Sequence, residues 1–211
     1  MPKRLLKKKP QKEKKKTTSK RIVKKKAAQK KFSKIEWEKL SVRQAAAVLR
    51  EHLLTITNRA ILVGSSCAAV YVPSLATKNL DFVISKFHIA EVGKLMKRLG
   101  FKARELRSFV CVKGPYEVRF PPPPPLAGDE PIESTVIVSS NQGPLELLTP
   151  TDCVRQRLAA WYRLGDEDGF QQAVAVAKKH PIDFDVVKQW SQWEWSTDKY
   201  ETFVRAVDNA P

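Results

Sequence analysis

The alternation of apolar and polar residues changes its period several times along the chain. Apolar residues first recur at helical spacing over residues 42–54, directly after Ser41 and Gln44, which form a capping-box pattern. The short apolar run 60–63 then predicts a buried strand, which leads through Gly64 and two serines into a helix of small residues. This strand-to-helix transition is also the first place in the chain where the residues indicate a candidate functional site.

Further along, the pattern changes from strands to helices. We expect one helix over residues 88–99 and a continuous series of helices from Thr151 onward. The expected strands are residues 80–84, 101–106, 108–113, 116–120 and 135–138, and the expected C-terminal helices are residues 152–164, 167–179, 183–193 and 198–207. This order predicts an α+β fold, with a core over residues 35–148 and a C-terminal helical region, residues 149–211, packed on it.

Five consecutive prolines, Pro121 to Pro125, interrupt the β-rich part of the chain. They force an extended left-handed backbone without hydrogen-bond donors, which is typical of ligands for SH3 and WW domains and also of rigid spacers. Because this run lies between two expected strands of one domain, the sequence favours a rigid connector.

Charge is divided unevenly along the 211 residues. Residues 1–34 contain 17 Lys/Arg and one acid, a net charge of +16, whereas residues 35–211 contain 22 Lys/Arg and 21 acids, a net charge of +1. The first segment has too few apolar residues to offset its ordering entropy, so we expect a basic disordered arm. The chain is therefore a nearly neutral domain that carries a polycationic segment.

Clusters of lysine without interleaved aromatic residues bind the phosphate backbone of nucleic acids rather than base edges. A tail that only aids solubility and a nuclear localisation signal are the alternatives. We expect RNA rather than DNA as the partner. The lysines expected to contact it are Lys7, Lys8, Lys9, Lys14, Lys15, Lys16, Lys24, Lys25, Lys26, Lys30 and Lys31.

Composition excludes several other classes of protein. No run of about 18 apolar residues is present, so we expect no membrane span, and no secretory signal is visible at the N-terminus. Cys67, Cys111 and Cys153 are far apart and lack ligand spacing, which supports neither a disulfide framework nor a zinc site. We expect a cytoplasmic protein with reduced thiols, with nuclear and organellar locations left open.

The segment around Gly64 combines the elements of a phosphate and metal site. A glycine lets the backbone approach a polyphosphate, and the hydroxyls of Ser65 and Ser66 together with a helix N-terminus supply donors to its oxygens. Carboxylates at alternate positions of the next strand share one face and hold Mg²⁺ in two-metal phosphoryl transfer. In this chain the alternate pair is Asn79 and Asp81, so one carboxylate is replaced by an amide.

Three segments resemble the nucleotidyltransferases of the DNA polymerase beta superfamily, and within it the bacterial abortive-infection (AbiE-type) toxins and related uncharacterised nucleotidyltransferase-like proteins. They are Leu62–Ser66 with Thr77–Val83, Phe120–Ile132, and Leu148–Ala160. The resemblance covers about residues 40–207. It implies a nucleotidyltransferase-like mixed sheet with flanking helices, and in active members Mg²⁺ and a nucleoside triphosphate.

The resemblance also assigns expected roles to single residues. Gly64 and Ser65 match the phosphate-binding element, and Asp81 matches the second metal carboxylate. Asn79 stands at the position of the first carboxylate, and Arg119 at that of the third.

Three residues near these positions complete the expected site. Glu117 shares the face of Arg119 by alternation and is a partial substitute for the missing carboxylate. Arg157 is a candidate phosphate contact, for which an ordinary solvated helix face is the alternative, and Asp166 fills an acidic position after its helix.

Two of the three expected metal carboxylates are thus replaced, one of them by a cation that repels Mg²⁺ and should form a salt bridge with Asp81. The leading hypothesis is a catalytically degenerate protein that needs no cofactor and binds RNA through its arm, as part of a ribonucleoprotein. The alternative is an active, toxin-type Mg²⁺-dependent nucleotidyltransferase that transfers a nucleoside monophosphate to RNA or protein, with an antitoxin partner.

Overall fold

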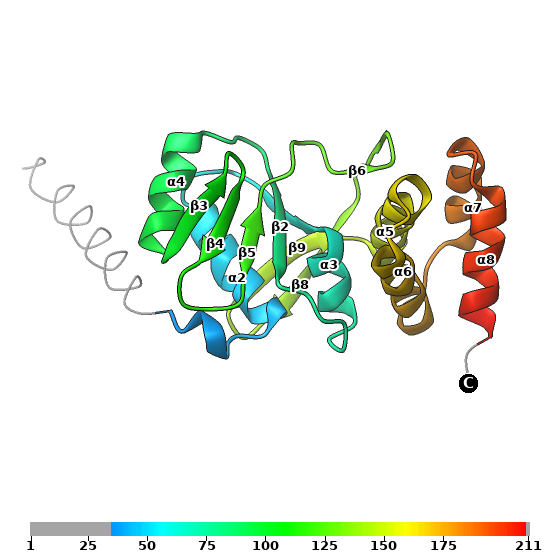
Figure 1. The fold of residues 1–211 in the computed structure, drawn as a ribbon, viewed down its shortest axis with the longest axis horizontal. Coiled ribbons are helices and arrows are strands. Elements are labelled where there is room, and N and C mark those ends of the chain that lie inside the picture. The colour runs from blue at the N-terminus through cyan, green and yellow to red at the C-terminus, as the bar shows by residue number, and fades with distance from the viewer. Residues whose placement is uncertain (1–34, 210–211) are drawn as a thin grey trace, which may run out of the picture. The chain divides into compact units, whose positions relative to one another are not determined.

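The computed structural model describes residues 35–209, and the fold below concerns that part of the chain (Figure 1). The expected arm, residues 1–34, and all the lysines expected to contact nucleic acid lie outside the described residues. From Glu36 onward the chain forms one compact unit, so the expected core and C-terminal helical region belong to the same body.

A seven-stranded mixed sheet forms the centre of this unit, with strand order β3-β4-β5-β2-β1-β9-β8. β1 pairs in parallel with β9 and β2 with β5, whereas the other neighbouring strands are antiparallel. The strands are β1 (Ala60–Val63), β2 (Asn79–Ile84), β3 (Phe101–Glu105), β4 (Ser108–Cys111), β5 (Glu117–Arg119), β8 (Thr135–Ser140) and β9 (Gly143–Leu148), and a separate pair is formed by β6 (Leu126–Ala127) and β7 (Glu130–Pro131). The expected α+β class is confirmed.

The helices surround this sheet and extend beyond it at one end. α5 and α6 pack against each other and against α3, and α7 and α8 pack on their far side (Figure 1). The elements are the short 3-10 helix η1 (Trp37–Lys39), α2 (Val42–Leu53), α3 (Gly64–Tyr71), α4 (Ile89–Arg98), α5 (Pro150–Leu164), α6 (Glu167–Lys179), α7 (Phe184–Trp193) and α8 (Thr197–Asp208).

Local signals explain where several of these helices begin and end. The capping box before α2 is formed as expected, because the Ser41 hydroxyl accepts a hydrogen bond from the Gln44 amide and the Gln44 side chain accepts one from the Ser41 amide. α5 begins after Thr149 with a proline in its first turn, and it ends at Gly165 in the left-handed conformation.

The central strands β1 and β2 are buried along nearly their whole length, with Leu62, Leu80 and Phe82 inaccessible to solvent. Strands covered on both faces read as continuous apolar runs, which is why the sequence predicted them without alternation. The proline run joins β5 to β6 within the same unit, and its last residue, Pro125, is buried.

The segment 135–148 differs from expectation. The sequence predicted one strand over residues 135–138, but the structure forms a β8–β9 hairpin in which β9 occupies the position beside β1. A charged residue, Glu146, interrupts the apolar pattern of β9 although it is only 8% exposed. This buried acid hid the strand from the sequence pattern.

The chain balances this buried acid with a hydrogen-bond network. The Glu146 carboxylate accepts hydrogen bonds from Arg59 at 2.8 Å, from the Thr135 hydroxyl at 2.9 Å and from Arg50 at 3.2 Å. Burial by itself would raise the pKa of Glu146, but these hydrogen bonds outweigh it and hold the pKa below its usual value. The network thus connects α2 and the residue that precedes β1 to the β8–β9 hairpin.

We expect Glu146→Gln to lower the free energy of unfolding at pH 7 by about 2 kcal/mol, because it leaves the buried guanidinium of Arg50 and the more exposed one of Arg59 without their counter-charge. A carboxylate whose pKa is depressed by folding stabilises the protein above its unfolded pKa, and this contribution is lost as the pH falls through the folded pKa. Urea unfolding at pH 7 and at acidic pH should therefore show a smaller acid-induced loss in the variant. The exposed Glu133→Gln is the matched control and should unfold like the unmodified protein.

Candidate functional site

The candidate site is built where β1 ends and α3 begins without an intervening loop. Gly64 is the first residue of α3 and has a φ of +66°, a conformation that side chains other than glycine rarely adopt. A Cβ atom placed on Gly64 would lie 2.7 Å from Oδ2 of Asp81. The expected glycine turn is therefore present, and both its dihedral angle and its close contact require glycine.

Asp81 lies on the neighbouring strand, in register with Val63 of β1. Its backbone amide donates a hydrogen bond of 3.1 Å to the Ser66 hydroxyl, which itself donates to the Val63 carbonyl at 2.8 Å. Ser66 is fully buried. The sequence placed Ser66 in a phosphate-binding element, but in the structure its hydroxyl joins the two strands to the first turn of α3.

Ser65 differs from Ser66 because its side chain is directed toward a cavity. Its hydroxyl forms a 3.0 Å hydrogen bond with the Thr77 hydroxyl, which also accepts one from the Asn79 amide at 3.1 Å. Ser65, Thr77 and Asn79 all line a cavity of about 910 Å³ between the strand ends and the α5–α6 helices. Asp81, Arg119, Arg157 and Asp166, which the sequence also singled out, line the same cavity.

The dominant interaction in this cavity is the ion pair between Asp81 and Arg119. Arg119 lies in register with Asp81 on the parallel neighbour β5, and it donates from Nε to Oδ1 at 2.7 Å and from Nη2 to Oδ2 at 2.9 Å. The Asp81 side chain is 8% exposed, and that of Arg119 is 46% exposed. The hydrogen bonds that Arg119 donates to the Asp81 carboxylate raise the pKa of Arg119. The expected salt bridge is confirmed.

The two residues beside this pair do not replace the missing carboxylates. Asn79 lines the cavity with an amide. Glu117 is in register with Asn79, but its carboxylate accepts hydrogen bonds from Arg104 at 2.8 Å and from Ser108 at 2.7 Å, on the side of β3 and β4. Glu117 is therefore already paired outside the cavity.

The residues present do not fit a divalent metal ion. Mg²⁺ needs several oxygen ligands in a near-octahedral arrangement, whereas both oxygens of Asp81 already accept hydrogen bonds from a guanidinium. Within residues 35–209, no group of three or more His, Cys, Asp or Glu side chains is arranged to hold a metal. We therefore derive no metal-dependent step at this site.

One residue of the site was missed by the sequence analysis. Gln156 on α5 accepts a hydrogen bond of 2.7 Å from the Gly64 amide and donates one of 3.0 Å to the Leu126 carbonyl. The first N–H group of α3, which an anion would otherwise approach, is thus bound by a side chain of the same protein. No local pattern marks Gln156, because its role depends on how α5 packs against α3.

The Arg157 side chain on α5 is mostly covered by the protein, so the solvated helix face considered for this residue is wrong. Arg157 lines the cavity with a side chain that is 14% exposed, and its Nη1 lies 3.3 Å from Oε1 of Gln172 and 3.8 Å from Asp166. Asp166 in turn caps α6 by accepting a hydrogen bond from the Gly169 amide. Both residues reach the cavity, but each also holds α6 in place.

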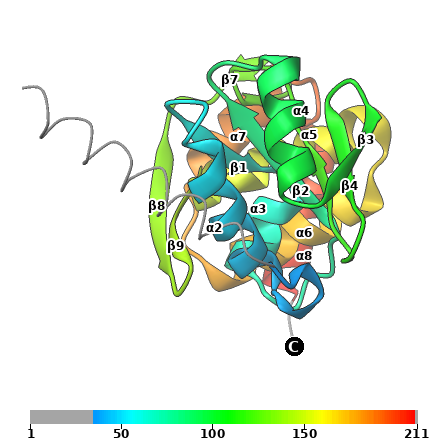
Figure 2. The ribbon, with the colours of Figure 1, turned by 90° about the vertical axis from the view of Figure 1, so that its left-hand side faces the viewer.

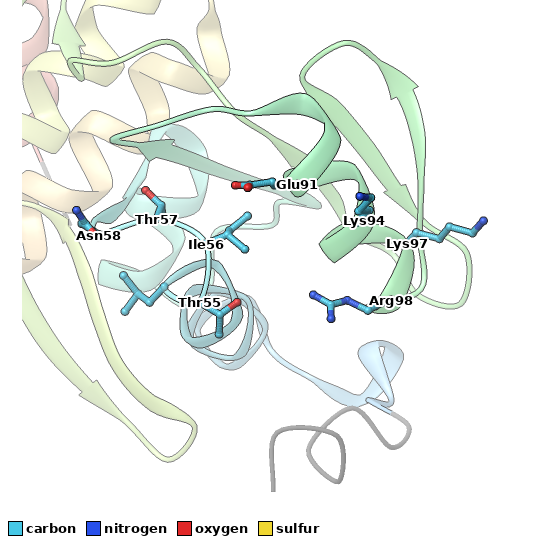
Figure 3. Close-up of a pocket in the computed structure, with 9 residues that line it drawn as sticks. Thr55, Ile56, Thr57, Asn58, Glu91, Lys94, Lys97 and Arg98 are labelled. Carbon is cyan, nitrogen blue, oxygen red and sulfur yellow. The ribbon is translucent and has the colours of Figure 1, made fainter. Parts of the chain in front are cut away.

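A second hollow lies away from these candidate residues, between α4 and the turn that follows α2. It has a volume of about 1000 Å³, and its lining includes Thr55, Asn58, Lys94, Lys97 and Arg98 (Figure 3). In Figure 3 the Arg98 side chain reaches toward the turn, whereas Lys97 points away from it. No residue of the expected nucleotidyltransferase site lines this hollow.

Comparison of the chain with family models, with curated proteins and with solved structures finds no match. Within residues 35–209, none of the helices combines the length and apolar character needed to cross a membrane. The three cysteines are buried and free of disulfide bonds. The resemblance to nucleotidyltransferases therefore stays a hypothesis that depends on the quoted segments.

We expect Gly64→Ala to destabilise the protein by at least about 2 kcal/mol, because the added methyl group meets Asp81 and the residue must keep a positive φ. Gly93→Ala in α4 is the matched control, since a Cβ there meets nothing within 4 Å. The control should be neutral or more stable by up to about 1 kcal/mol, owing to the higher helix propensity of alanine. Denaturant unfolding measures both, and equal stability of the two variants would contradict the strained turn.

Proposed function

We propose that this protein is a catalytically degenerate, nucleotidyltransferase-like protein that binds RNA through its lysine-rich residues 1–34, as a component of a ribonucleoprotein. The observation that carries the RNA-binding part is the separation of charge, +16 in residues 1–34 against +1 in the rest of the chain. Each phosphate neutralised by a lysine releases condensed counterions, so such a segment binds polyanions strongly at low salt.

The degenerate part of the proposal is supported by the Asp81–Arg119 pair. A buried carboxylate needs a counter-charge, and in this site a guanidinium occupies both of its oxygens. A metal could reach Asp81 only after Arg119 had been displaced, and Arg119 would repel it from nearby.

The alternative function is that of an active Mg²⁺-dependent nucleotidyltransferase that uses a nucleoside triphosphate and modifies RNA or protein. It is favoured by the cavity of about 910 Å³ in which Lys78, Arg119 and Arg157 lie together with the Ser65 hydroxyl. Cations and hydroxyls of this kind suit phosphate oxygens. The two functions differ in their need for a metal, which makes them separable by experiment.

Deleting residues 1–34 should remove nearly all affinity for RNA, by at least about 100-fold at low salt. The thermal midpoint should stay within about 2 °C, because the folded unit that begins at Glu36 keeps its own core. If about ten lysines engage phosphates, log K of the unmodified protein should fall with log[salt] at a slope of roughly −7 to −9. Fluorescence anisotropy with labelled RNA and DNA measures these quantities, and retained affinity after the deletion would refute the proposal.

Isothermal titration of the unmodified protein with Mg²⁺ and each nucleoside triphosphate should show no metal-dependent binding, and radiolabelled nucleotide should not be transferred to RNA or protein. The Asn79→Asp variant should likewise show neither metal-dependent binding nor transfer, because Arg119 still donates hydrogen bonds to both oxygens of Asp81. The double variant with Asn79→Asp and Arg119→Glu should gain Mg²⁺ binding, since it supplies three neighbouring carboxylates. Labelling by the unmodified protein would instead establish the alternative.

A further inference from the structure

The nearly neutral folded unit is itself divided into a basic and an acidic part. Residues 85–113 contain eight Lys/Arg and two acids, a net charge of +6. Residues 165–211 contain five Lys/Arg and nine acids, a net charge of −4. The overall value of +1 for residues 35–211 therefore conceals two opposed regions.

These two regions lie at opposite ends of the folded unit. Residues 85–113 include α4, β3 and β4, which contact one another at the edge of the sheet, and Figure 2 shows α4 beside the β3–β4 pair. α7 and α8, which belong to the acidic region, lie at the other end in Figure 1. The charge separation along the sequence thus becomes a separation in space.

The lysines of the basic end are exposed and available to a ligand. Among residues 35–209, the ion pairs of the structure involve none of these lysines, whereas Arg104 is paired with Glu117. Arg107 likewise donates to the Phe120 carbonyl and lies over the Phe87 ring. The exposed lysines are Lys86, Lys94, Lys97, Lys102 and Lys113, which we call the α4–β3 basic surface.

This surface is hollowed on the side of α4. The hollow of about 1000 Å³ is lined by Glu91, Lys94, Lys97 and Arg98 from the helix, and by Thr55 and Asn58 from the facing turn, with the Lys97 ammonium group directed outward at its rim (Figure 3). Three cations against one carboxylate on the helix side, and hydroxyl and amide groups on the other side, offer hydrogen bonds that phosphate oxygens can accept. Within residues 85–113 no Phe, Tyr or Trp side chain is exposed, since Phe87 is half-buried with Arg107 over its ring, so His88 is the exposed ring of this segment.

We propose that the α4–β3 basic surface is a second RNA-binding site, which holds the phosphate backbone without reading its sequence. This inference rests on the proposed RNA binding by residues 1–34 and adds the place at which the folded unit contacts the same ligand. The positive charge attracts the backbone to this end, and the acidic α6–α8 end repels it, so the charge separation also orients the bound molecule.

The start of the folded unit lies beside this surface. Trp37 of η1 packs edge-on against Phe101 of β3, with ring centroids 5.0 Å apart, and donates a hydrogen bond of 2.9 Å to the Leu99 carbonyl at the end of α4. An RNA held by residues 1–34 is tethered to the folded unit at this point. The lysines of the surface therefore meet it at a raised effective concentration, which makes even a weak second contact measurable.

The test compares two triple variants of the full chain that lose the same charge. Lys94→Gln, Lys97→Gln and Lys102→Gln change the basic surface, whereas Lys178→Gln, Lys179→Gln and Lys188→Gln change exposed lysines of α6 and α7. Binding of a fluorescent 20-nucleotide single strand and of a 16-base-pair RNA duplex is followed by anisotropy at several KCl concentrations. The surface variant should bind about tenfold more weakly at 100 mM salt, with a salt slope smaller by about 2, and the control variant should stay within about twofold.

A third variant keeps the charge of the surface. Lys94→Arg, Lys97→Arg and Lys102→Arg should retain the affinity of the unmodified protein, which separates loss of contact from loss of folding. Equal weakening by the two glutamine variants, or no weakening by the surface variant, would overturn this inference. The RNA-binding proposal itself stands or falls with the deletion of residues 1–34, so the two failures are distinguishable.

Discussion

The centre of this fold depends on the ion pair that one buried carboxylate makes with a guanidinium. Asp81 lies where β1, β2 and β5 meet the first turn of α3, and the surrounding chain is shaped around it. Gly64 leaves room for its oxygens, the Ser66 hydroxyl satisfies its amide, and Arg119 provides its counter-charge. A buried Asp81 carboxylate without a partner would cost several kcal/mol. β5 must therefore pair with β2 in the register that places Arg119 beside Asp81.

The same arrangement leaves the polar groups at this junction already bound within the protein. The Asp81 carboxylate accepts hydrogen bonds from a guanidinium, and the first N–H group of α3 donates to Gln156. Side chains of the protein thus satisfy the groups that would otherwise bind a ligand. Positive charge is concentrated elsewhere, in the sequence of residues 1–34 and in the exposed lysines of the α4–β3 basic surface.

The sequence predicted those parts of the fold and site that depend on local pattern. The capping box at Ser41, the buried β1 and β2 strands, and the Gly64 turn facing Asp81 all follow from residue spacing, whereas the Asp81–Arg119 pair was predicted from the resemblance to nucleotidyltransferases. Gln156 and Glu146 could not be found in this way. One looks like a solvated helix residue and the other like a break in a strand, until partners distant in sequence satisfy them.

The position of β9 has a consequence for how the chain is made. β1 is central in the sheet, yet one of its edges is completed only by β9, near the end of the β-rich part of the chain. During vectorial synthesis, β1 leaves the ribosome long before this partner, so an apolar strand edge stays open to mispairing with other nascent chains. The polycationic residues 1–34 have already emerged by then, and the mutual repulsion between such chains opposes their association while the sheet is incomplete.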